Sequence, residues 1–344
     1  MNERTTKVIV TGFVVAAMLM QTALAQDTPA QPGPSGYHLL KTITVGGTEN
    51  WDYVTMDSAS RRLYIGRDDH IDVVDVDAGT VVGKVTALSH THGMVIAPEF
   101  GRGFTSDGDS NTSTIVDLKT LKKIGSVETG KDPDSFVYDE VTKRVFIMNS
   151  AGNTATALNA ADGTLAGTVA LEGQPEAAVA DGKGKIFVNM TDKDEVVEFD
   201  GQSLKVLHRW PLAPGVGPSG LAIDRKNRLL FSVCDNQKLV VMNADTGKVV
   251  GTPGVGAGTD ASLFDPDTGN AFASAGGSAT LTVVHEDSPD HFRVVDNVQT
   301  QSGARTMALD TKTHNILLVT ARHGHGATHS QILPNTFVVL IVGK

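Results

Sequence analysis

The chain has 344 residues, a length that suits either two average domains or one larger domain built from repeats. Its 29 Lys and Arg residues are outnumbered by 39 Asp and Glu residues, and the formal net charge of −10 argues against a nucleic-acid partner, which needs clustered cations. The single cysteine, Cys234, excludes an intrachain disulfide and any metal site of several thiolates.

The first 25 residues resemble a removable secretion signal. Arg4 and Lys7 precede the apolar stretch 8–20, and Ala23-Leu24-Ala25 supplies the small-residue pattern of a cleavage site, so we predict cleavage after Ala25. The alternative is a membrane anchor, but the stretch is shorter than the roughly 20 residues needed to span a bilayer. We expect a periplasmic or secreted protein without membrane insertion. Residues 26–36, "QDTPAQPGPSG", predict a flexible lead-in.

From Gly46 onward the sequence repeats about every 42 residues, the period of a four-stranded propeller blade. The clearest copy, 133–171, contains an apolar stretch ending in Asp139, the strand "RVFIMN", the strand "NTATALN" and the strand "TLAGTVAL". Three reversals join these four strands. The copies begin near seven residues: Trp51, His92, Asp134, Glu176, Ser219, Asp260 and Arg305.

Acidic residues at the strand ends predict tight turns. An Asp closes the opening strand of six copies, each time before a polar hairpin, because its side chain can bond to the backbone of the turn. We assign these acids a structural role: Asp57, Asp139, Asp181, Asp224, Asp265 and Asp310.

The last copy supplies only three strands, "TMALD", "NILLVTA" and "TFVVLIVGK". The segment 37–45, "YHLLKTITV", resembles an outer strand and precedes the first full copy, so we expect it to complete the last blade and to leave no edge unpaired there. The sequence therefore predicts an all-β protein in which residues 37–344 form one seven-bladed β-propeller.

These repeats resemble the YVTN-type (YncE-like) seven-bladed β-propellers of exported bacterial proteins. The namesake tetrapeptide is degenerate here, with "FIMN" at 146–149, "FVNM" at 187–190 and "LYIG" at 63–66 in its place. The resemblance spans about residues 37–344. It implies a binding or scaffolding protein more readily than an enzyme, and a related superfamily that includes lactonases keeps catalysis open.

Alternation of the strands places the first residue of each innermost strand on one face, at the rim of the central channel. The seven rim positions are Asp52, His92, Asp134, Glu176, Ser219, Asp260 and Arg305. Asp134 is expected to leave the sheet and to face water or a ligand.

The rim acids are either simply solvated or functional. Two carboxylates about 10 Å apart in water repel each other by roughly 0.4 kcal/mol. Arg305 and a protonated His92 are internal counterions, and Ca²⁺ is an external one. Two carboxyl groups in close contact would also have different pKa values, one raised above the other, as acid/base catalysis requires.

Histidines flank the same face. His90 and His92 lie in "SHTHG", and three more lie in the long loop of the last blade, "ARHGHGATHSQ": His323, His325 and His329. Imidazoles with a carboxylate are suitable ligands for zinc or copper. The alternative is a solvent-exposed loop without metal.

Two further residues are expected at the mouth. Ser219 stands between glycines in "GPSGLA", but it opens an inner strand and lacks the strand-turn-helix setting of a nucleophile. Trp51 either stacks on a small ligand or packs in the core.

Two functions follow as hypotheses. The first is a non-catalytic propeller that binds a small ligand, a metal ion or a protein partner at this mouth. The second is a metal-dependent hydrolase or lyase of lactonase-like type, with His92 as proton shuttle. Its candidate ligands or acid/base groups are Asp52, Asp134, Glu176 and Asp260.

Overall fold

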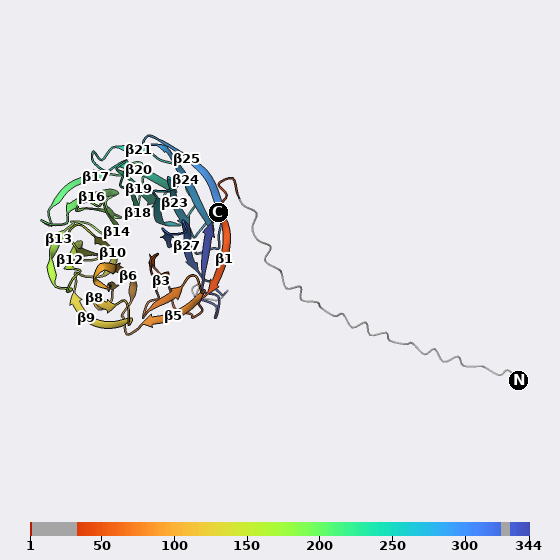
Figure 1. The fold of residues 1–344 in the computed structure, drawn as a ribbon. Helices are drawn as coiled ribbons and strands as arrows, with labels where there is room; N and C mark the ends of the chain where they lie inside the picture. The colour runs from red at the N-terminus through yellow and green to blue at the C-terminus, as the bar shows by residue number, and fades with distance from the viewer. Residues whose placement is uncertain (2–32, 325–330) are drawn as a thin grey trace.

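The fold is a closed ring of seven four-stranded antiparallel sheets, as predicted (Figure 1). The computed structural model describes residue 1 and residues 33–324 and 331–344. Residues 2–25 of the proposed signal and most of the lead-in therefore lie outside the described residues. Within residues 33–324 and 331–344, no helical segment has the length and apolar character that a membrane crossing requires.

The first three blades follow one another along the chain. Blade 1 consists of β2 (Val54–Asp57), β3 (Arg62–Gly66), β4 (Ile71–Asp75) and β5 (Thr80–Val85). Blade 2 consists of β6 (Thr91–Ala97), β7 (Arg102–Asp107), β8 (Thr112–Asp117) and β9 (Lys122–Glu128), with a short 3₁₀ helix, η1 (Pro98–Phe100), between its first two strands. Blade 3 consists of β10 (Pro133–Asp139), β11 (Arg144–Asn149), β12 (Thr154–Asn159) and β13 (Leu165–Ala170).

The next three blades repeat this order. Blade 4 consists of β14 (Pro175–Ala180), β15 (Lys185–Met190), β16 (Glu195–Asp200) and β17 (Val206–Pro211). Blade 5 consists of β18 (Pro218–Asp224), β19 (Leu229–Cys234), β20 (Lys238–Asn243) and β21 (Val249–Gly251). Blade 6 consists of β22 (Thr259–Asp265), β23 (Asn270–Ala275), β24 (Thr280–Ser288) and β25 (His291–Gln299).

Blade 7 joins the two ends of the described chain. Its strands are β26 (Met307–Asp310), β27 (Asn315–Thr320), β28 (Val338–Gly343) and, as the outermost strand, β1 (His38–Thr44). β1 pairs antiparallel with β28, so that His38 lies opposite Gly343 and Thr44 opposite Val338. This confirms the prediction that an N-terminal strand closes the last blade.

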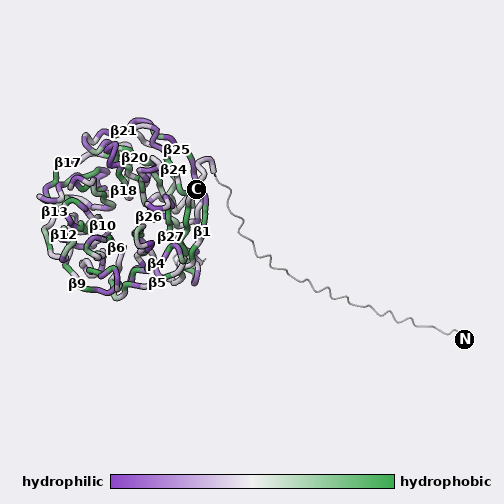
Figure 2. Tube along the Cα trace, viewed as in Figure 1, coloured by the Kyte–Doolittle hydropathy of each residue, from purple (hydrophilic) through white to green (hydrophobic). Residues whose placement is uncertain are grey.

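The hydrophobic core lies between the blades. The two middle strands of a blade are buried on both faces, so each sheet packs against the sheets before and after it. Phe104 of blade 2, for example, belongs to one apolar cluster with Ile147 of blade 3, and Phe231 of blade 5 belongs to another with Ala273 of blade 6. Figure 2 shows hydrophobic segments all around the ring. Such face-to-face burial is the main favourable contribution to folding.

The acids that close the inner strands form the predicted turns. The Asp139 carboxylate accepts hydrogen bonds from the backbone and hydroxyl of Thr142, and that of Asp310 accepts them from the Lys312 backbone and the Thr313 hydroxyl. Asp310 has a second contact, because Arg61 Nη1 of blade 1 lies 2.6 Å from its Oδ2. The turn of blade 7 is thereby tied to blade 1.

Arg67 is the largest fully buried side chain of the junction between blade 1 and blade 7. Its guanidinium donates to Asp72 Oδ2 at 2.9 Å and to the backbone carbonyls of Gly46, Glu49 and Asn50. Its Cζ also lies 3.7 Å from the centre of the Phe337 ring. Because Asp72 is only 2% exposed, this is a buried charge pair with several supporting hydrogen bonds.

Candidate functional site

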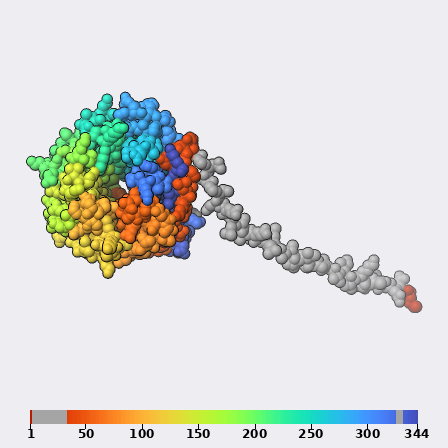
Figure 3. Space-filling view, viewed as in Figure 1, coloured from red at the N-terminus to blue at the C-terminus, as the bar shows by residue number. Residues whose placement is uncertain are grey.

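The residues predicted to rim the channel lie where the inner strands begin. Figure 3 shows a hollow at the centre of the ring. In blades 2 to 6 the rim residues are the second residue of the inner strand, at a register shift between that strand and its neighbour. Asp134 therefore does not leave the sheet, contrary to our expectation: it belongs to β10 and its side chain is only 18% exposed. A β-bulge turns side chains away from the regular alternation, which directs these toward the channel.

His92 lies between two carboxylates. Its Nδ1 is 2.8 Å from Asp52 Oδ2 and 3.3 Å from Asp134 Oδ1. Burial alone would lower the pKa of His92, but the hydrogen bond to Asp52 and the charge of Asp134 outweigh it and raise the pKa to about 9. At neutral pH the imidazole is therefore a cation.

Arg305 lies between Asp52 and Asp260, as His92 lies between Asp52 and Asp134. Its Nη2 lies 3.8 Å from Asp52 Oδ1, and its Nε lies 3.5 Å from Asp260 Oδ2. Burial raises the pKa of Asp260 to about 6, with Arg305 acting against the rise. Five neighbouring rim positions thus alternate in sign around the ring: Asp134, His92, Asp52, Arg305 and Asp260. The counterions considered from the sequence, Arg305 and protonated His92, stand between the acids.

Glu176, on the far side of the ring, is held by a residue of blade 1. Tyr53 Oη donates to Glu176 Oε1 at 2.7 Å, so the phenol reaches across the channel. The Tyr53 ring also packs edge-on against Phe136 of blade 3, with 5.5 Å between ring centres. Burial, followed by the charge of Asp134, raises the pKa of Glu176 to about 8.

Gly93 provides the space for these two aromatic rings. A Cβ atom there would lie 2.8 Å from Phe136 Cζ and 2.9 Å from Tyr53 Cβ, closer than such atoms approach. The inner strand of blade 2 therefore needs glycine immediately after His92, because the rings of blades 1 and 3 meet over it.

Ser219 does not present its hydroxyl to the channel as a nucleophile. Its Oγ donates to the backbone carbonyl of Asp260 in the next blade at 3.1 Å. Ser135 and Thr306 make the same kind of bond to the carbonyls of Glu176 and Asp52. These hydroxyls fix the rim of one blade to its neighbour, which is a structural role.

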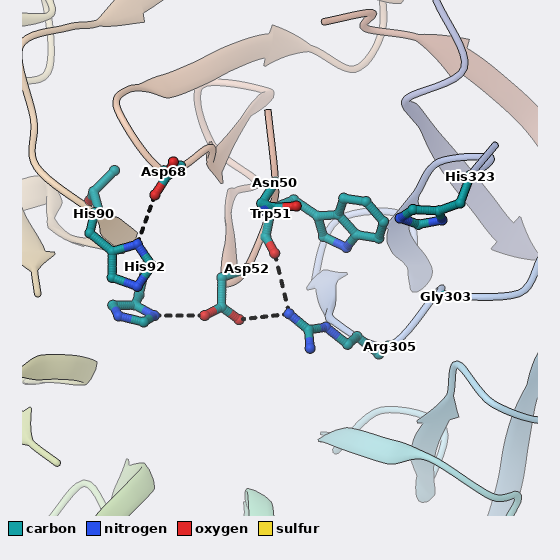
Figure 4. Close-up of a pocket in the computed structure, with 10 residues that line it drawn as sticks. Asn50, Trp51, Asp52, Asp68, His90, His92, Gly303, Arg305 and His323 are labelled. Carbon is teal, nitrogen blue, oxygen red and sulfur yellow. Dashed lines mark hydrogen bonds and ion pairs between the residues drawn. The ribbon is translucent and has the colours of Figure 1, made fainter. Parts of the chain in front are cut away.

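A cavity of about 400 Å³ opens at the mouth beside blades 7, 1 and 2 (Figure 4). Its walls carry both charges, an aromatic ring and several imidazoles. The lining residues are Asn50, Trp51, Asp52, Asp68, His90, Thr91, His92, Gly303, Arg305 and His323.

Trp51 forms one wall of this cavity and is 9% exposed. Its ring packs 5.4 Å from the Phe337 ring and 5.8 Å from that of His323, measured between centres. The packing role considered from the sequence is thus present. Its indole nitrogen, Nε1, is buried and has no hydrogen-bond partner among the described residues.

Among the described residues, His90, His92 and His323 do not converge as one set of metal ligands. His90 Nδ1 is bound to Asp68 Oδ1 at 2.7 Å, and Figure 4 shows His323 at the opposite end of the cavity, beyond the Trp51 ring. His325 and His329 lie outside the described residues. Within the described part of the chain, His90 and His323 belong to neither group of close potential ligands; these are Asp52, His92 and Asp134, and Asp265, Asp267 and His314.

Sequence reasoning missed Tyr53, Phe136 and Asp68. The first two have a visible signal, because an aromatic residue follows a rim acid by one position in "WDY" and by two in "DSF". Asp68 has none, since its contact with His90 joins two loops whose approach only the folded blades determine.

Protein-family models give no match to the chain, and no curated protein matches it. Solved structures share its fold at low identity. The RRP9 WD40 repeats are 10% identical with a TM-score of 0.76, covering 92% of this chain and 100% of that one. U3-55K is 9% identical with a TM-score of 0.75, covering 90% and 99%. A chain of hydrazine synthase from Kuenenia stuttgartiensis is 12% identical with a TM-score of 0.68, covering 80% and 93%. The likeness establishes the WD40-like propeller fold alone.

Proposed function

We propose that the chain is an exported member of the YVTN-type (YncE-like) propellers that binds a small ligand, without transforming it, in the cavity at its channel mouth. The observation that carries the proposal is the convergence of polar rim residues from separate blades on one cavity of about 400 Å³. Ligand pockets typically measure about 300–1,000 Å³ and contain a few convergent polar groups. Export rests on the signal-like segment 1–25 and on the family resemblance.

A small ligand fits the recessed position of the polar groups better than a protein surface does. Of the lining residues, the side chains of His92 and Asp52 are 16% and 27% exposed, and Trp51 is 9% exposed. A flat partner would touch the loops without reaching these groups. A chain of the mitotic checkpoint complex shares the fold at 11% identity, and a protein partner is accordingly the competing occupant of the mouth.

The two tryptophans of the chain provide a direct test. Trp210 lies on β17, the outer strand of blade 4, stacked on His208, whereas Trp51 lines the cavity. In the Trp210→Phe variant, Trp51 is the only tryptophan, so its emission reports the mouth. We expect a screen of organic acids, amines and sugars by native mass spectrometry to yield a bound compound that also changes this emission saturably.

The matched control is the Trp51→Phe variant, which keeps Trp210. The same compound should leave its emission unchanged. Compounds that bind by mass spectrometry but leave Trp51 emission unchanged would place the ligand elsewhere, and a screen without any bound compound would refute small-ligand binding of these classes.

A second candidate function, metal binding, is favoured by one observation: ligand atoms of Asp52, His92 and Asp134 all lie within 4.8 Å of one another. One imidazole and two carboxylates suit Zn²⁺, which would leave a fourth position open to the channel. The metal would have to displace the proton of His92, so its affinity should rise with pH. An open position is also what the alternative hydrolase would need, with the metal activating water.

Metal titration tests this second candidate. We expect the dialysed protein to bind one equivalent of Zn²⁺ if the site is used, and the His92→Gln variant to lose that binding while His314→Gln, which alters the other group of potential ligands, keeps it. A lactone hydrolysis screen with and without chelator then distinguishes a hydrolase from a binding protein. Equal Zn²⁺ binding by the wild type and His92→Gln would exclude this site.

A further inference from the structure

The hydrogen-bond donors of the mouth cavity indicate the chemical class of its ligand. We propose that the cavity recognises a small organic carboxylate, whose oxygens accept hydrogen bonds from Trp51 Nε1 and from the Arg305 guanidinium. This inference rests on the proposed small-ligand function and specifies it. Its donors, Trp51 and Arg305, are not members of the Asp52, His92 and Asp134 group, although Arg305 lies next to Asp52.

Trp51 supplies the first donor. More than nine-tenths of the residue is buried, yet its indole N–H, which can only donate, has no partner among the described residues. Buried polar groups are normally hydrogen-bonded, so an unpaired one needs an explanation. Figure 4 shows the indole nitrogen on the edge of the ring that faces Arg305. An acceptor atom of a ligand between these two residues would supply the missing bond.

Arg305 supplies the second set of donors. A guanidinium carries five N–H groups in one plane, a geometry that matches both oxygens of a carboxylate. Within the part of the chain that the structure describes, this side chain makes one direct hydrogen bond, from Nη2 to the Trp51 carbonyl at 3.3 Å. The acids on either side, Asp52 and Asp260, are 3.8 and 3.5 Å away, and the side chain is 46% exposed. Arg305 therefore has donors left for a ligand.

Each acid that lines the cavity has one oxygen engaged by a histidine. Asp52 Oδ2 is bound to His92 Nδ1, and Asp68 Oδ1 to His90 Nδ1. The wall thus offers donors without partners among the described residues, at Trp51 and Arg305, which favours an acid over an amine. The rim acids limit the charge: Asp52, Asp134 and Asp260 would repel a second anionic group. We therefore expect a monocarboxylate with polar, uncharged substituents.

Matched acid and amide pairs test the class. The probes are lactate with lactamide and phenylacetate with phenylacetamide, titrated into the Trp210→Phe variant with Trp51 emission and calorimetry as readouts. We expect an acid of the panel to bind at least about tenfold more tightly than its amide, the size of effect expected for a charge-assisted hydrogen bond. Succinate should bind more weakly than the better monocarboxylate.

Two variants locate the binding groups. Arg305→Gln should remove the preference for acid over amide, and Trp51→Phe, which keeps an aromatic ring but removes the N–H, should weaken acid binding about five- to tenfold by calorimetry. Arg209→Gln on β17, which removes an arginine far from the mouth, should leave binding unchanged. Thermal unfolding of each variant confirms that it is folded, and Arg305, being half-exposed, is the safer substitution.

The outcomes separate this inference from the proposed function. If a neutral or cationic compound changes Trp51 emission and no acid does, the carboxylate class is wrong while small-ligand binding stands. Acid binding that survives both Arg305→Gln and Trp51→Phe would also overturn the inference. If no compound of the panel or of the wider screen affects Trp51, the proposed function itself fails.

Discussion

Replacement of Arg67 by Met should lower the free energy of unfolding by about 3–5 kcal/mol, the usual cost of removing one partner of a buried ion pair. Met approximates the aliphatic volume of arginine, so the loss reflects the charge and its hydrogen bonds. The carboxylate of Asp72, 2% exposed, would keep only Lys84 Nζ at 3.1 Å and His70 nearby. The carbonyls of Gly46, Glu49 and Asn50 would lose their donor as well. Urea denaturation measures the difference.

The control for this prediction is Arg293→Met. Arg293 pairs with Asp287 at 2.8 Å on the outer strand of blade 6, where the side chain is 56% exposed, so the change should stay below about 1 kcal/mol. The double variant R67M/D72N should recover part of the loss, because it removes the unpaired charge as well. If R67M and R293M unfold at the same urea concentration, the prediction that Arg67 stabilises the protein far more than Arg293 is wrong.

Replacement of Glu176 by Gln should stabilise the ligand-free protein at alkaline pH and leave it unchanged at pH 4. The pKa of Glu176 is raised from 4.5 to about 8, first by burial and then by the charge of Asp134. An acid whose pKa is raised on folding contributes stability that is fully present below its unfolded pKa and lost as the pH rises through its folded pKa. The loss between about pH 4.5 and pH 8 amounts to about 3–5 kcal/mol. Gln removes it and still accepts the Tyr53 hydrogen bond.

The other rim groups act in the same direction. His92, with its pKa raised to about 9, and Asp134, with its pKa raised to about 6, also lose their stabilising protonated state as the pH rises. The wild type should therefore unfold at lower urea concentration at pH 9 than at pH 5. Glu99→Gln is the control, because Lys143 lowers the pKa of Glu99 and the sign is opposite. If the free energy of unfolding of E176Q changes with pH as much as that of the wild type, the pKa of Glu176 is not raised as stated.

The ring could be predicted from the sequence because the same pattern of turns and strands repeats along the chain. Turn acids such as Asp139 and Asp310 recur at one place in the repeat, and the apolar runs between them have strand length, so blade number and the role of the strand at 37–45 follow from counting. The gathering of Asp52, His92 and Asp134 at one opening could also be anticipated, since a closed ring brings equivalent positions of all blades together.

Contacts that occur in one blade and not in the others could not be predicted from the repeat pattern. The bulge that directs Asp134 into the channel is a register change without a signature residue. The bond from Tyr53 to Glu176 joins blades 1 and 4, and the burial of Arg67 depends on the loop before blade 1 and on Phe337 near the other end of the chain. Each involves residues whose approach is set by tertiary packing, which a repeat pattern does not encode.

The pairing of β1 with β28 has a consequence for how the molecule comes apart. In an open stack of repeats, the end units have one neighbour and fray first. Here every sheet has a neighbour on both sides, so no unit is terminal and separating any one of them breaks two interfaces at once. Denaturation is then expected to be a single cooperative event, with hydrogen-exchange protection of comparable strength in all seven units instead of a gradient from one end to the other.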